Sequence, residues 1–470
     1  MRLALNDIVM ATGGTLLRGD RHTIIERVST DTRVLRPGDL FVAITGERFD
    51  GNAFAVRALA AGAQGVICTD DAIREGLPGE GFVLLVEDGT EALGAIGREW
   101  RRKLGLMVVG LTGSTGKTTT KELAAHLCEG SVPVFATEGN KNNHVGLPLM
   151  LARLSEEHAA AILEMGMNHA GEIAYLVNIA EPEIGLLTNI GDAHLGNFAN
   201  HDALTAAKAE LFTTMQPGGT ALINCDCPHI AKILPAIAAR HKTVLFGEGK
   251  QAHVRARNIE AEKPFGYRFE LLVNGRGVPV YLPVFGRYQI ANALGAVAVA
   301  IELGVPLEDA VDRLATFTAP EMRSRIQNIE GVRIIEDCYN ASPSAVESAL
   351  ASLGQIAGRG RRYTLLGDMN ELGGFAEACH RRVGRAAASA KLDGIFTVGD
   401  LSVWITSEAL DREASARHFD SIEEAAEHLA GILRADDAVL VKGSRIARLE
   451  RAIDFLRAGL LGRARKGVVV

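Results

Sequence analysis

Short apolar runs separated by stretches of helical periodicity recur along the chain. Such runs begin at Gly65, Phe82, Leu106, Ala160, Ile184, Thr220 and Thr243. A brief apolar run bounded by polar and glycine residues is typical of a buried strand. Because strands that alternate with helices form parallel sheets covered by those helices, the pattern predicts an α/β protein.

Two regions depart from this alternation. Between Val254 and Val284, Asn274-Gly275 separates two β-rich runs, which predicts a hairpin and therefore a small antiparallel insert. Beyond Ala319-Pro320 a new series of strands begins, with the runs VRIIED, YTLLGDM, IFTVGD and AVLVKGS. This second series predicts a separate doubly wound, Rossmann-like domain.

The length of the chain supports a division into three domains. A chain of 470 residues exceeds one ordinary core, since domains usually hold about 100 to 200 residues. We place the boundaries near Gly105 and near Thr318. Residues 1–105 then form a small α/β cap, residues 106–318 a central parallel sheet with the insert, and residues 319–470 the doubly wound domain.

The composition narrows the class of partner. Hydrophobic residues make up 47% of the chain and charged residues 23%, as in ordinary globular proteins. The net charge of -7 disfavours a nucleic-acid binder, which needs a basic surface, so small molecules are the favoured partners. No apolar run reaches the ~18 residues that cross a bilayer, and the amino terminus lacks the pattern of a secretory signal. We therefore expect no membrane span and a location in the cytoplasm.

The segment from Leu111 to Thr120, LTGSTGKTTT, carries the strongest chemical signal. It places a glycine turn between an apolar strand and a helix, where backbone N–H groups bind phosphate oxygens. Lys117 would neutralise the terminal phosphates, and the Thr118 hydroxyl would ligate magnesium. The full Walker pattern requires glycine at position 111, so only the shorter form is present, and a plain glycine-rich connection is the alternative. The candidate nucleotide-binding residues are Gly113, Ser114, Thr115, Gly116, Lys117, Thr118 and Thr119.

Two further side chains follow predicted strands of the central domain. Glu164 ends the run AAILE, and His194 follows the run GLLTNIGDA. Because the carboxyl ends of strands line the ligand crevice of an open α/β sheet, both side chains should point toward the bound phosphates. A carboxylate suits magnesium, and the imidazole could be a second ligand or a partner of metal-bound water. The alternative for each is a solvated residue at a strand end.

Lys208 falls on the apolar stripe of the helix that follows Asp202. The stripe comprises Leu204, Leu211, Phe212 and Met215, so the lysine is expected to be buried. One interpretation is a lysine stem that extends along the edge of the core. The other is a desolvated, neutral amine that reacts with carbon dioxide to form a carbamate, whose negative charge can ligate magnesium.

Segments from all three predicted domains together resemble the Mur ligase family. They are TGSTGKTTTKE, EMGMNHAGEI, NIGDAHLGNF, TAAKAELF, GRYQIANAL, EDCYNASPSA, LGDMNELG and VKGSR, in this order. The resemblance implies an ATP-dependent amide-bond ligase of peptidoglycan synthesis. EMGMNHAGEI, YNASP and GDMNELG favour the member that adds D-alanyl-D-alanine to a UDP-N-acetylmuramoyl-tripeptide over members that add a single amino acid.

The resemblance also assigns roles in catalysis and ATP binding. Lys117, Lys208 and His194 match catalytic residues, with Lys208 at the position of a lysine that is carbamylated in relatives. The implied magnesium site comprises Thr118, Glu164, His194 and Lys208. Asn292 matches the asparagine that reads adenine, and Arg323 and Asp337 match nucleotide contacts from the third domain, although Arg325 could replace Arg323. Thr115 and Tyr288 stand where the family pattern has asparagine and histidine.

The substrate contacts implied by the resemblance lie in three groups. Asp31, Arg33 and Asp50 are candidates for the UDP-sugar, so residues 1–105 would be the UDP-sugar-binding domain; a polar turn before a strand is the alternative. The cluster for the muramoyl peptide is Asn140, Asn142 and Asn143. The candidates for the carboxylate of the incoming dipeptide are Asn340, Lys442, Ser444 and Arg445, with solvated residues at a helix start as the alternative.

These parts predict a reaction through an acyl phosphate, formed from a peptide carboxylate and the γ-phosphoryl group of ATP. The expected partners are UDP-N-acetylmuramoyl-tripeptide and D-alanyl-D-alanine, and a monomer is expected. Because nucleotide contacts come from two domains, catalysis should require domain closure. The alternatives are a family member that adds a single amino acid, a folate ligase and a nucleotide-dependent binding switch.

Overall fold

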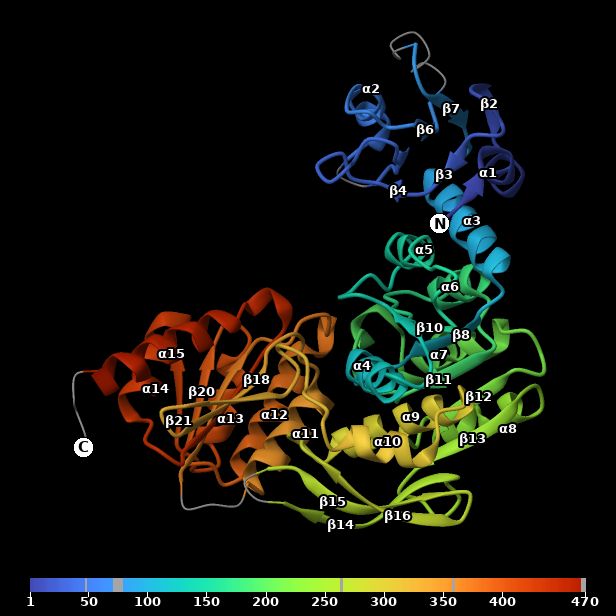
Figure 1. The fold of residues 1–470 in the computed structure, drawn as a ribbon. Coiled ribbons are helices and arrows are strands. Elements are labelled where there is room, and N and C mark those ends of the chain that lie inside the picture. Colours follow the sequence, from blue (N-terminus) through green and yellow to red (C-terminus); the bar gives the residue numbers. More distant parts are fainter. Residues whose placement is uncertain (47–48, 71–78, 263–264, 357–359, 466–470) are drawn as a thin grey trace.

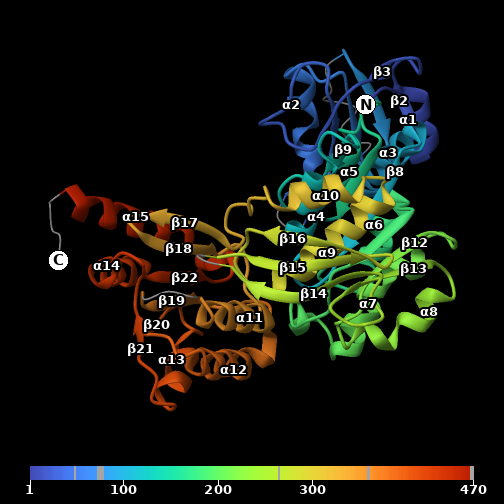
Figure 2. The same cartoon turned by 60° about the horizontal axis from the view of Figure 1, so that its bottom comes forward.

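The computed structural model describes residues 1–46, 49–70, 79–262, 265–356 and 360–465. In both views the N-terminal domain stands on the central domain, and the C-terminal domain lies beside it (Figure 1, Figure 2). Each domain is built on its own sheet, so the three-domain α/β organisation is confirmed. Among the described residues, no helix has the length and apolar character needed to span a membrane.

The N-terminal domain is built on a small sheet that is parallel except at one edge, where β2 runs antiparallel to β7. In spatial order its strands are β2 (Thr15–Arg18), β7 (Phe82–Leu85), β6 (Gly65–Cys68), β5 (Leu40–Val42) and β4 (Val28–Ser29). A separate antiparallel pair joins β1 (Leu3–Ala4) and β3 (Ile24–Ile25). The helix α1 (Leu5–Thr12) precedes β2, and the helix α2 (Ala55–Ala60) precedes β6.

The helix α3 (Gly89–Leu104) connects the first two domains. It begins where the Asp88 carboxylate accepts hydrogen bonds from the first turn, and it ends at Gly105, whose φ of 61° is left-handed. Its apolar residues belong to one core that runs from the N-terminal sheet into the central domain. The Trp100 indole N–H also donates to the carbonyl of Leu154 at 2.9 Å. The cap is therefore packed against the central domain.

The central domain contains a sheet whose strands run parallel from β9 to β14 and antiparallel beyond it. The parallel strands preceding the insert are β8 (Met107–Thr112), β9 (Val134–Ala136), β10 (Ala160–Glu164), β11 (Ile184–Leu187), β12 (Thr220–Asn224) and β13 (Lys242–Gly247). The predicted insert is confirmed as β14 (Val254–Ala261), β15 (Tyr267–Val273) and β16 (Arg276–Leu282), with its tight turn at Asn274-Gly275. It continues the central sheet, because β14 pairs with β13.

Helices cover both faces of the central sheet. One face packs against α4 (Lys117–Cys128), α9 (Tyr288–Glu302) and α10 (Leu307–Leu314). The other face packs against α5 (Gly146–Leu151), α6 (Glu172–Ala180) and α7 (His201–Thr214), in the core that also contains α3. The short helix α8 (Leu234–Ala238) precedes β13.

The C-terminal domain is doubly wound, as predicted. Its strands, in spatial order, are β17 (Arg325–Ile329), β18 (Val332–Asp337), β22 (Ala438–Lys442), β19 (Arg362–Gly367), β20 (Gly394–Val398) and β21 (Ala416–Phe419). One face carries α14 (Ile422–Ile432) and α15 (Glu450–Arg465), and the other carries α11 (Pro343–Gly354), α12 (Ala376–Ser389) and α13 (Val403–Leu410). The edge strands β17 and β21 add to the strands predicted from the sequence.

Candidate active site

The glycine turn between β8 and α4 is shaped by close packing. Gly113 and Gly116 have φ values of 151° and 79°, a region that favours glycine. A Cβ atom at Gly113 would lie 1.9 Å from Thr188 Oγ1, and one at Gly116 would lie 2.2 Å from Asn292 Oδ1. Both glycines therefore allow a close approach that no other residue permits.

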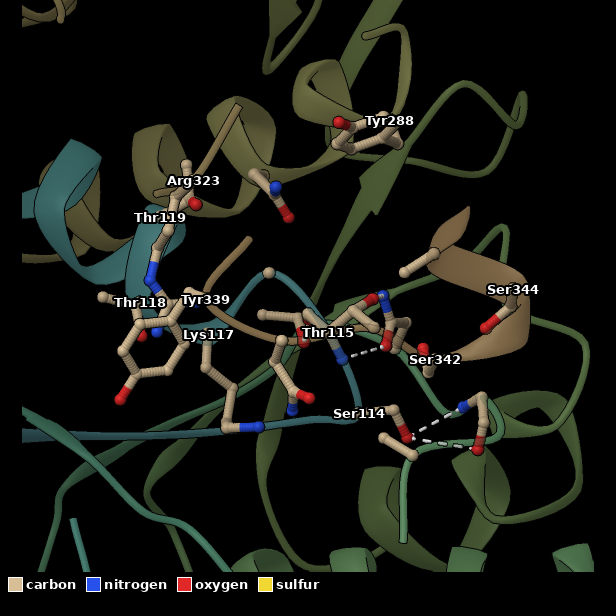
Figure 3. Close-up of a pocket in the computed structure, with 18 of the residues that line it drawn as sticks. Ser114, Thr115, Lys117, Thr118, Thr119, Tyr288, Arg323, Tyr339, Ser342 and Ser344 are labelled. Atoms are coloured by element: carbon tan, nitrogen blue, oxygen red, sulfur yellow. Dashed lines mark hydrogen bonds between the residues drawn. The ribbon is translucent and has the colours of Figure 1, made fainter. Parts of the chain in front are cut away.

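The loop after β11 is hydrogen bonded to Ser114 and Thr115 of this turn (Figure 3). The Thr115 N–H donates to Asn189 Oδ1 at 3.0 Å, and Asn189 Nδ2 donates to Thr115 Oγ1 at 2.6 Å. The Gly191 N–H donates to Ser114 Oγ at 2.8 Å. These bonds hold the phosphate-binding turn in one shape, and the Asn189 contact was not foreseen from the sequence.

Two lysines converge on the carbonyl of Gly113. Lys117 Nζ donates to it at 2.8 Å and Lys208 Nζ at 3.3 Å. Lys208 is 1% exposed, as its position on the apolar stripe predicts. Burial lowers the pKa of Lys208 well below its ordinary value, and the charge of Lys117 lowers that pKa further. Burial also lowers the pKa of Lys117, but Glu164 opposes this effect. Lys208 is thus the amine favoured to be neutral.

Glu164 lies beside the start of α4. Its Oε2 atom accepts a hydrogen bond from Thr118 Oγ1 at 2.7 Å, and its Oε1 atom accepts one from Asn142 Nδ2 at 2.8 Å. A buried carboxylate and a hydroxyl are oxygen ligands of the kind that magnesium prefers. Within the described residues, no group of three or more His, Cys, Asp or Glu side chains could hold a metal. Thr118 and Glu164 thus place two oxygen donors side by side at the start of α4.

His194 faces the C-terminal domain. It has a left-handed φ of 64° and precedes the 3₁₀ turn η3 (Leu195–Asn197). Its Nδ1 atom lies 2.6 Å from Glu371 Oε2, and this contact lowers the pKa of Glu371. Glu371 is a cleft residue that sequence reasoning did not single out, although it lies in the GDMNELG segment.

The C-terminal domain brings Arg323 and Asp337 to the same region. The Arg323 guanidinium lies 4.0 Å from the centre of the Tyr339 ring, and Asp337 Oδ2 accepts from Lys442 Nζ at 2.7 Å. Arg325, by contrast, pairs with Glu321 at 2.9 Å and does not line the cleft. Of these two arginines, Arg323 is therefore the one that lines the cleft.

A cleft of about 670 Å³ separates the two domains, and most predicted site residues line it. From the central domain these are Ser114, Thr115, Gly116, Lys117, Thr118, Thr119, Asn140, Asn142, Asn143, Glu164, His194 and Asn292. From the C-terminal domain they are Arg323, Asp337, Asn340 and Lys442. The cleft therefore combines the glycine turn, a carboxylate and cationic side chains.

Comparison with known proteins identifies the family. The Mur ligase middle domain matches residues 111–300, the glutamate ligase domain of Mur ligases matches residues 322–445, and the Mur ligase family catalytic domain matches residues 24–101. The UDP-N-acetylmuramoyl-tripeptide–D-alanyl-D-alanine ligase of Bacillus subtilis is 31% identical over 460 residues, which cover 97% of this chain and 98% of that protein. The chain belongs to the Mur ligase family. The Escherichia coli ligase of the same name is 35% identical over 436 residues, with 92% and 94% covered.

Solved structures extend the match to the whole Mur ligase fold. MurF from Acinetobacter baumannii superposes with a TM-score of 0.89 at 33% identity and covers 97% of this chain and 99% of its own. The MurF ligase of Thermotoga maritima, solved in complex with ADP, gives a TM-score of 0.83 at 28% identity, with 93% and 98% covered. All three domains are therefore arranged as in a Mur ligase.

The predicted residues of this Mur ligase that lie outside the cleft have local partners. In the N-terminal domain, Arg33 hydrogen bonds lower the pKa of Asp31 to about 2, and Asp50 Oδ1 accepts the N–H of Asn52 at 2.9 Å. In the C-terminal domain, Ser444 Oγ accepts from Asn370 Nδ2 at 2.6 Å, and Arg445 pairs with Glu450 at 2.6 Å. These residues are thus not among those that line the cleft.

Proposed function

We propose that this Mur ligase joins D-alanyl-D-alanine to a UDP-N-acetylmuramoyl-tripeptide, with ATP as the energy source, in peptidoglycan synthesis. One observation carries the proposal: Lys117 and Glu164 of the central domain face the same cleft as Arg323 and Asp337 of the C-terminal domain. A site divided in this way suits a reaction that brings a nucleotide and two further substrates together. Relatives that carry this activity in their names match over nearly their whole length.

The reaction proceeds in two steps. A peptide carboxylate is a poor acyl donor, so one of its oxygens first takes the γ-phosphoryl group of ATP, which releases ADP and gives an acyl phosphate. The dipeptide amine then attacks the acyl carbon, loses a proton and expels phosphate as the amide forms. Lys117 and the N–H groups of the glycine turn stabilise negative charge on the transferred phosphoryl group.

Magnesium is part of this proposal. Thr118 and Glu164 would hold the cation, and Lys208 would add an oxygen ligand as a carbamate. His194 would lie near this magnesium site. When bound, the cation neutralises phosphate charge. The buried amine of Lys208 supports the carbamate, because its lowered pKa favours the neutral form that attacks carbon dioxide.

The remaining substrate contacts follow the same division. We assign the UDP-sugar to residues 1–105 through Asp31, Arg33 and Asp50, and the muramoyl peptide to the asparagine cluster of residues 140–143. The dipeptide carboxylate would meet Asn340 and Lys442, whereas Ser444 and Arg445, also candidates from the sequence, are not among the residues that line the cleft. We expect the ligase to act as a monomer, and the use of ATP fits a cytoplasmic enzyme.

Mass spectrometry of the products tests the activity. The protein is incubated with ATP, magnesium and UDP-muramoyl tripeptides that contain lysine or diaminopimelate, together with either D-alanyl-D-alanine or single amino acids. We expect a product only with the dipeptide. A product with a single amino acid would favour another member of the family, and nucleotide binding without any product would favour a nucleotide-dependent switch.

A second measurement tests the coupling of the two steps. Phosphate release is followed with each substrate omitted in turn. Because domain closure should exclude water from the acyl phosphate, strong ATP turnover without the peptide substrates would contradict the mechanism.

A further inference from the structure

The first turn of α11 meets the cleft with a serine hydroxyl that has no partner. Ser342 directly precedes this helix, is 6% exposed and lines the cleft. Throughout the part of the chain that the structure describes, Ser342 Oγ finds no hydrogen-bond partner. A buried hydroxyl without a partner is costly, so a ligand that approached from the cleft would gain a hydrogen bond there.

Ser342 occupies the N-cap position of α11 without capping it. A serine at this position usually accepts a hydrogen bond from the second or third N–H group of the helix, but its side chain makes no such bond here. The first N–H groups of a helix have no acceptor within the helix. The N–H groups of Ser344 and Ala345, two residues that line the cleft, therefore lack the acceptor that Ser342 would supply.

This turn lies across the domain interface from the phosphate-binding turn (Figure 3). A Cβ atom built on Gly191 would lie 3.0 Å from Ser344 Oγ and 3.7 Å from Ser114 Cβ, so both turns flank the same glycine. The N-termini of α4 and α11 thus approach one part of the cleft from different domains. Each N-terminus carries partial positive charge and favours an anion.

The charged side chains around the cleft are compatible with an added anion. Lys117 and Arg323 line it, and Lys442 is already balanced by Asp337 at 2.7 Å. Glu371, the acidic residue contributed by the loop after β19, is paired with His194. An anion at the start of α11 would therefore meet N–H donors, in a cleft whose lining combines these cationic side chains with the carboxylates of Glu164, Glu172 and Asp226.

We propose that Ser342 and the first turn of α11 form an oxyanion-binding site that the C-terminal domain contributes to the ligase reaction. The inference rests on the proposed function. Ser342 Oγ donates one hydrogen bond, and the N–H groups of Ser344 and Ala345 donate two more. Two reactants carry a suitable oxyanion, namely the nucleotide through its phosphates and the dipeptide through its terminal carboxylate.

Two substitutions at one position test the site. Ser342→Ala removes the donor, whereas Ser342→Asp restores a helix cap but places a negative charge where the oxyanion would bind. The matched control is Ser352→Ala. This substitution removes a hydroxyl from the same helix, but that hydroxyl already donates a hydrogen bond to the Ser348 carbonyl. The dissociation constant of ADP with magnesium is measured by calorimetry, the KM of D-alanyl-D-alanine by ligation rates, and the melting temperature by calorimetry.

The two candidate oxyanions, a phosphate of the nucleotide and the carboxylate of the dipeptide, predict different results. If the site holds a phosphate, Ser342→Ala weakens ADP binding about tenfold and Ser342→Asp weakens it more. If the site holds the carboxylate, ADP binding stays constant and the KM of the dipeptide rises by similar factors. Ser342→Asp keeps or raises the melting temperature in either case. Ser352→Ala changes neither the dissociation constant of ADP nor the KM of the dipeptide.

The proposal is overturned if both variants leave both constants within about twofold of the unsubstituted protein. It is also overturned if Ser342→Asp restores what Ser342→Ala loses, since that result would show a helix cap and no ligand site. Failure of the proposed function can be distinguished from failure of this site. If the proposed function is wrong, the unsubstituted protein gives no product with the dipeptide, but the ADP titrations still decide whether the first turn of α11 binds phosphate.

Discussion

Lys208 carries an amine in a place that water barely reaches. It is 1% exposed, and its Nζ atom shares the Gly113 carbonyl with Lys117. A charged ammonium buried beside another cation is unfavourable, whereas a neutral amine or a carbamate removes the repulsion. The chemistry of the site therefore depends on the protonation state of this one side chain.

Removal of the Lys208 side chain should abolish most of the ligation. We expect Lys208→Ala to lower the rate of product formation by roughly 100-fold or more, because the proposed carbamate would then be lost from the magnesium site. Added acetate or formate should restore part of the rate by occupying the vacated space. The control is Lys232→Ala, which removes an exposed lysine paired with Asp202. A Lys208→Ala protein with normal rates would rule out the carbamate.

The lowered pKa of Lys208 should also make stability depend on pH. The unfolded chain keeps a proton on this lysine up to its ordinary pKa of 10.5, but the folded protein loses that proton at lower pH. Between these values the unfolded state binds more protons, so the free energy of unfolding rises with pH. In urea unfolding at about pH 7 and about pH 9 in buffer free of carbon dioxide, the rise should be smaller for Lys208→Met. Equal rises would mean that the folded protein keeps the charged form.

At the level of the elements, the turn between β8 and α4 depends on the absence of side chains. Gly116 and Gly105 both have left-handed φ values, but only Gly116 lies against a neighbour, since a Cβ at Gly105 would meet nothing within 4 Å. The two positions therefore form a matched pair that separates backbone strain from steric contact.

We expect Gly105→Ala and Gly116→Ala each to cost about 1 to 2 kcal/mol of unfolding free energy through backbone strain. Gly116→Ala should in addition abolish ADP binding, because its Cβ would push Asn292 and distort the turn. Calorimetric titration with ADP and urea unfolding measure the two effects. Retained ADP affinity in Gly116→Ala would show that the turn tolerates a side chain.

The elements found from the sequence are those with a local signature. β8, β10, β11 and β12 are buried on both faces and read as continuous apolar runs. β17, by contrast, is a half-exposed edge strand with the sequence RIQNI, and β21 is a short edge strand. Neither has enough apolar character to stand out, because their hydrogen bonds to neighbouring strands determine their conformation.

The same distinction applies to the site. The glycine turn, Glu164 and Lys208 could be predicted because each follows from strand ends or helical periodicity. Glu371 and Asn189 could not, because their importance arises from contacts between loops that are distant in the sequence. The unpartnered hydroxyl of Ser342 could not be predicted either, because a serine at a helix N-cap usually makes a capping hydrogen bond and this one does not.

At the scale of the molecule, a cluster of ion pairs joins the central and C-terminal domains. Arg382 of α12 contacts Asp192 Oδ2 at 2.5 Å and Glu347 at 2.9 Å, while His201 contacts Asp192 Oδ1 at 3.0 Å. Although burial acts to raise the pKa of Asp192, its partners hold that pKa below the usual value. Asp192 lies two residues before His194, so this cluster fixes the loop that faces Glu371.

Disruption of this cluster should weaken catalysis without altering either domain. We expect Asp192→Ala and Arg382→Ala each to lower kcat/KM about tenfold, and the double variant to lose little more, because both act through one contact. The control is Arg385→Ala, which lies on the same helix but pairs with Glu408 inside the C-terminal domain at 3.4 Å. Steady-state rates measure the effect. Fully additive losses would show that the two residues act independently.

The helix α3 has a consequence for any compound designed against this enzyme. Because its apolar face packs into one core that is common to the cap and the nucleotide domain, those two bodies behave as a single rigid half. The C-terminal domain contacts the central domain through polar loop contacts, such as His194 with Glu371, and through Phe285 and Tyr288, which pack into one of its apolar clusters. An inhibitor that spans the α3 junction would thus bind two domains joined by one continuous core, whereas one bound beside α11 would contact groups contributed by two separate cores.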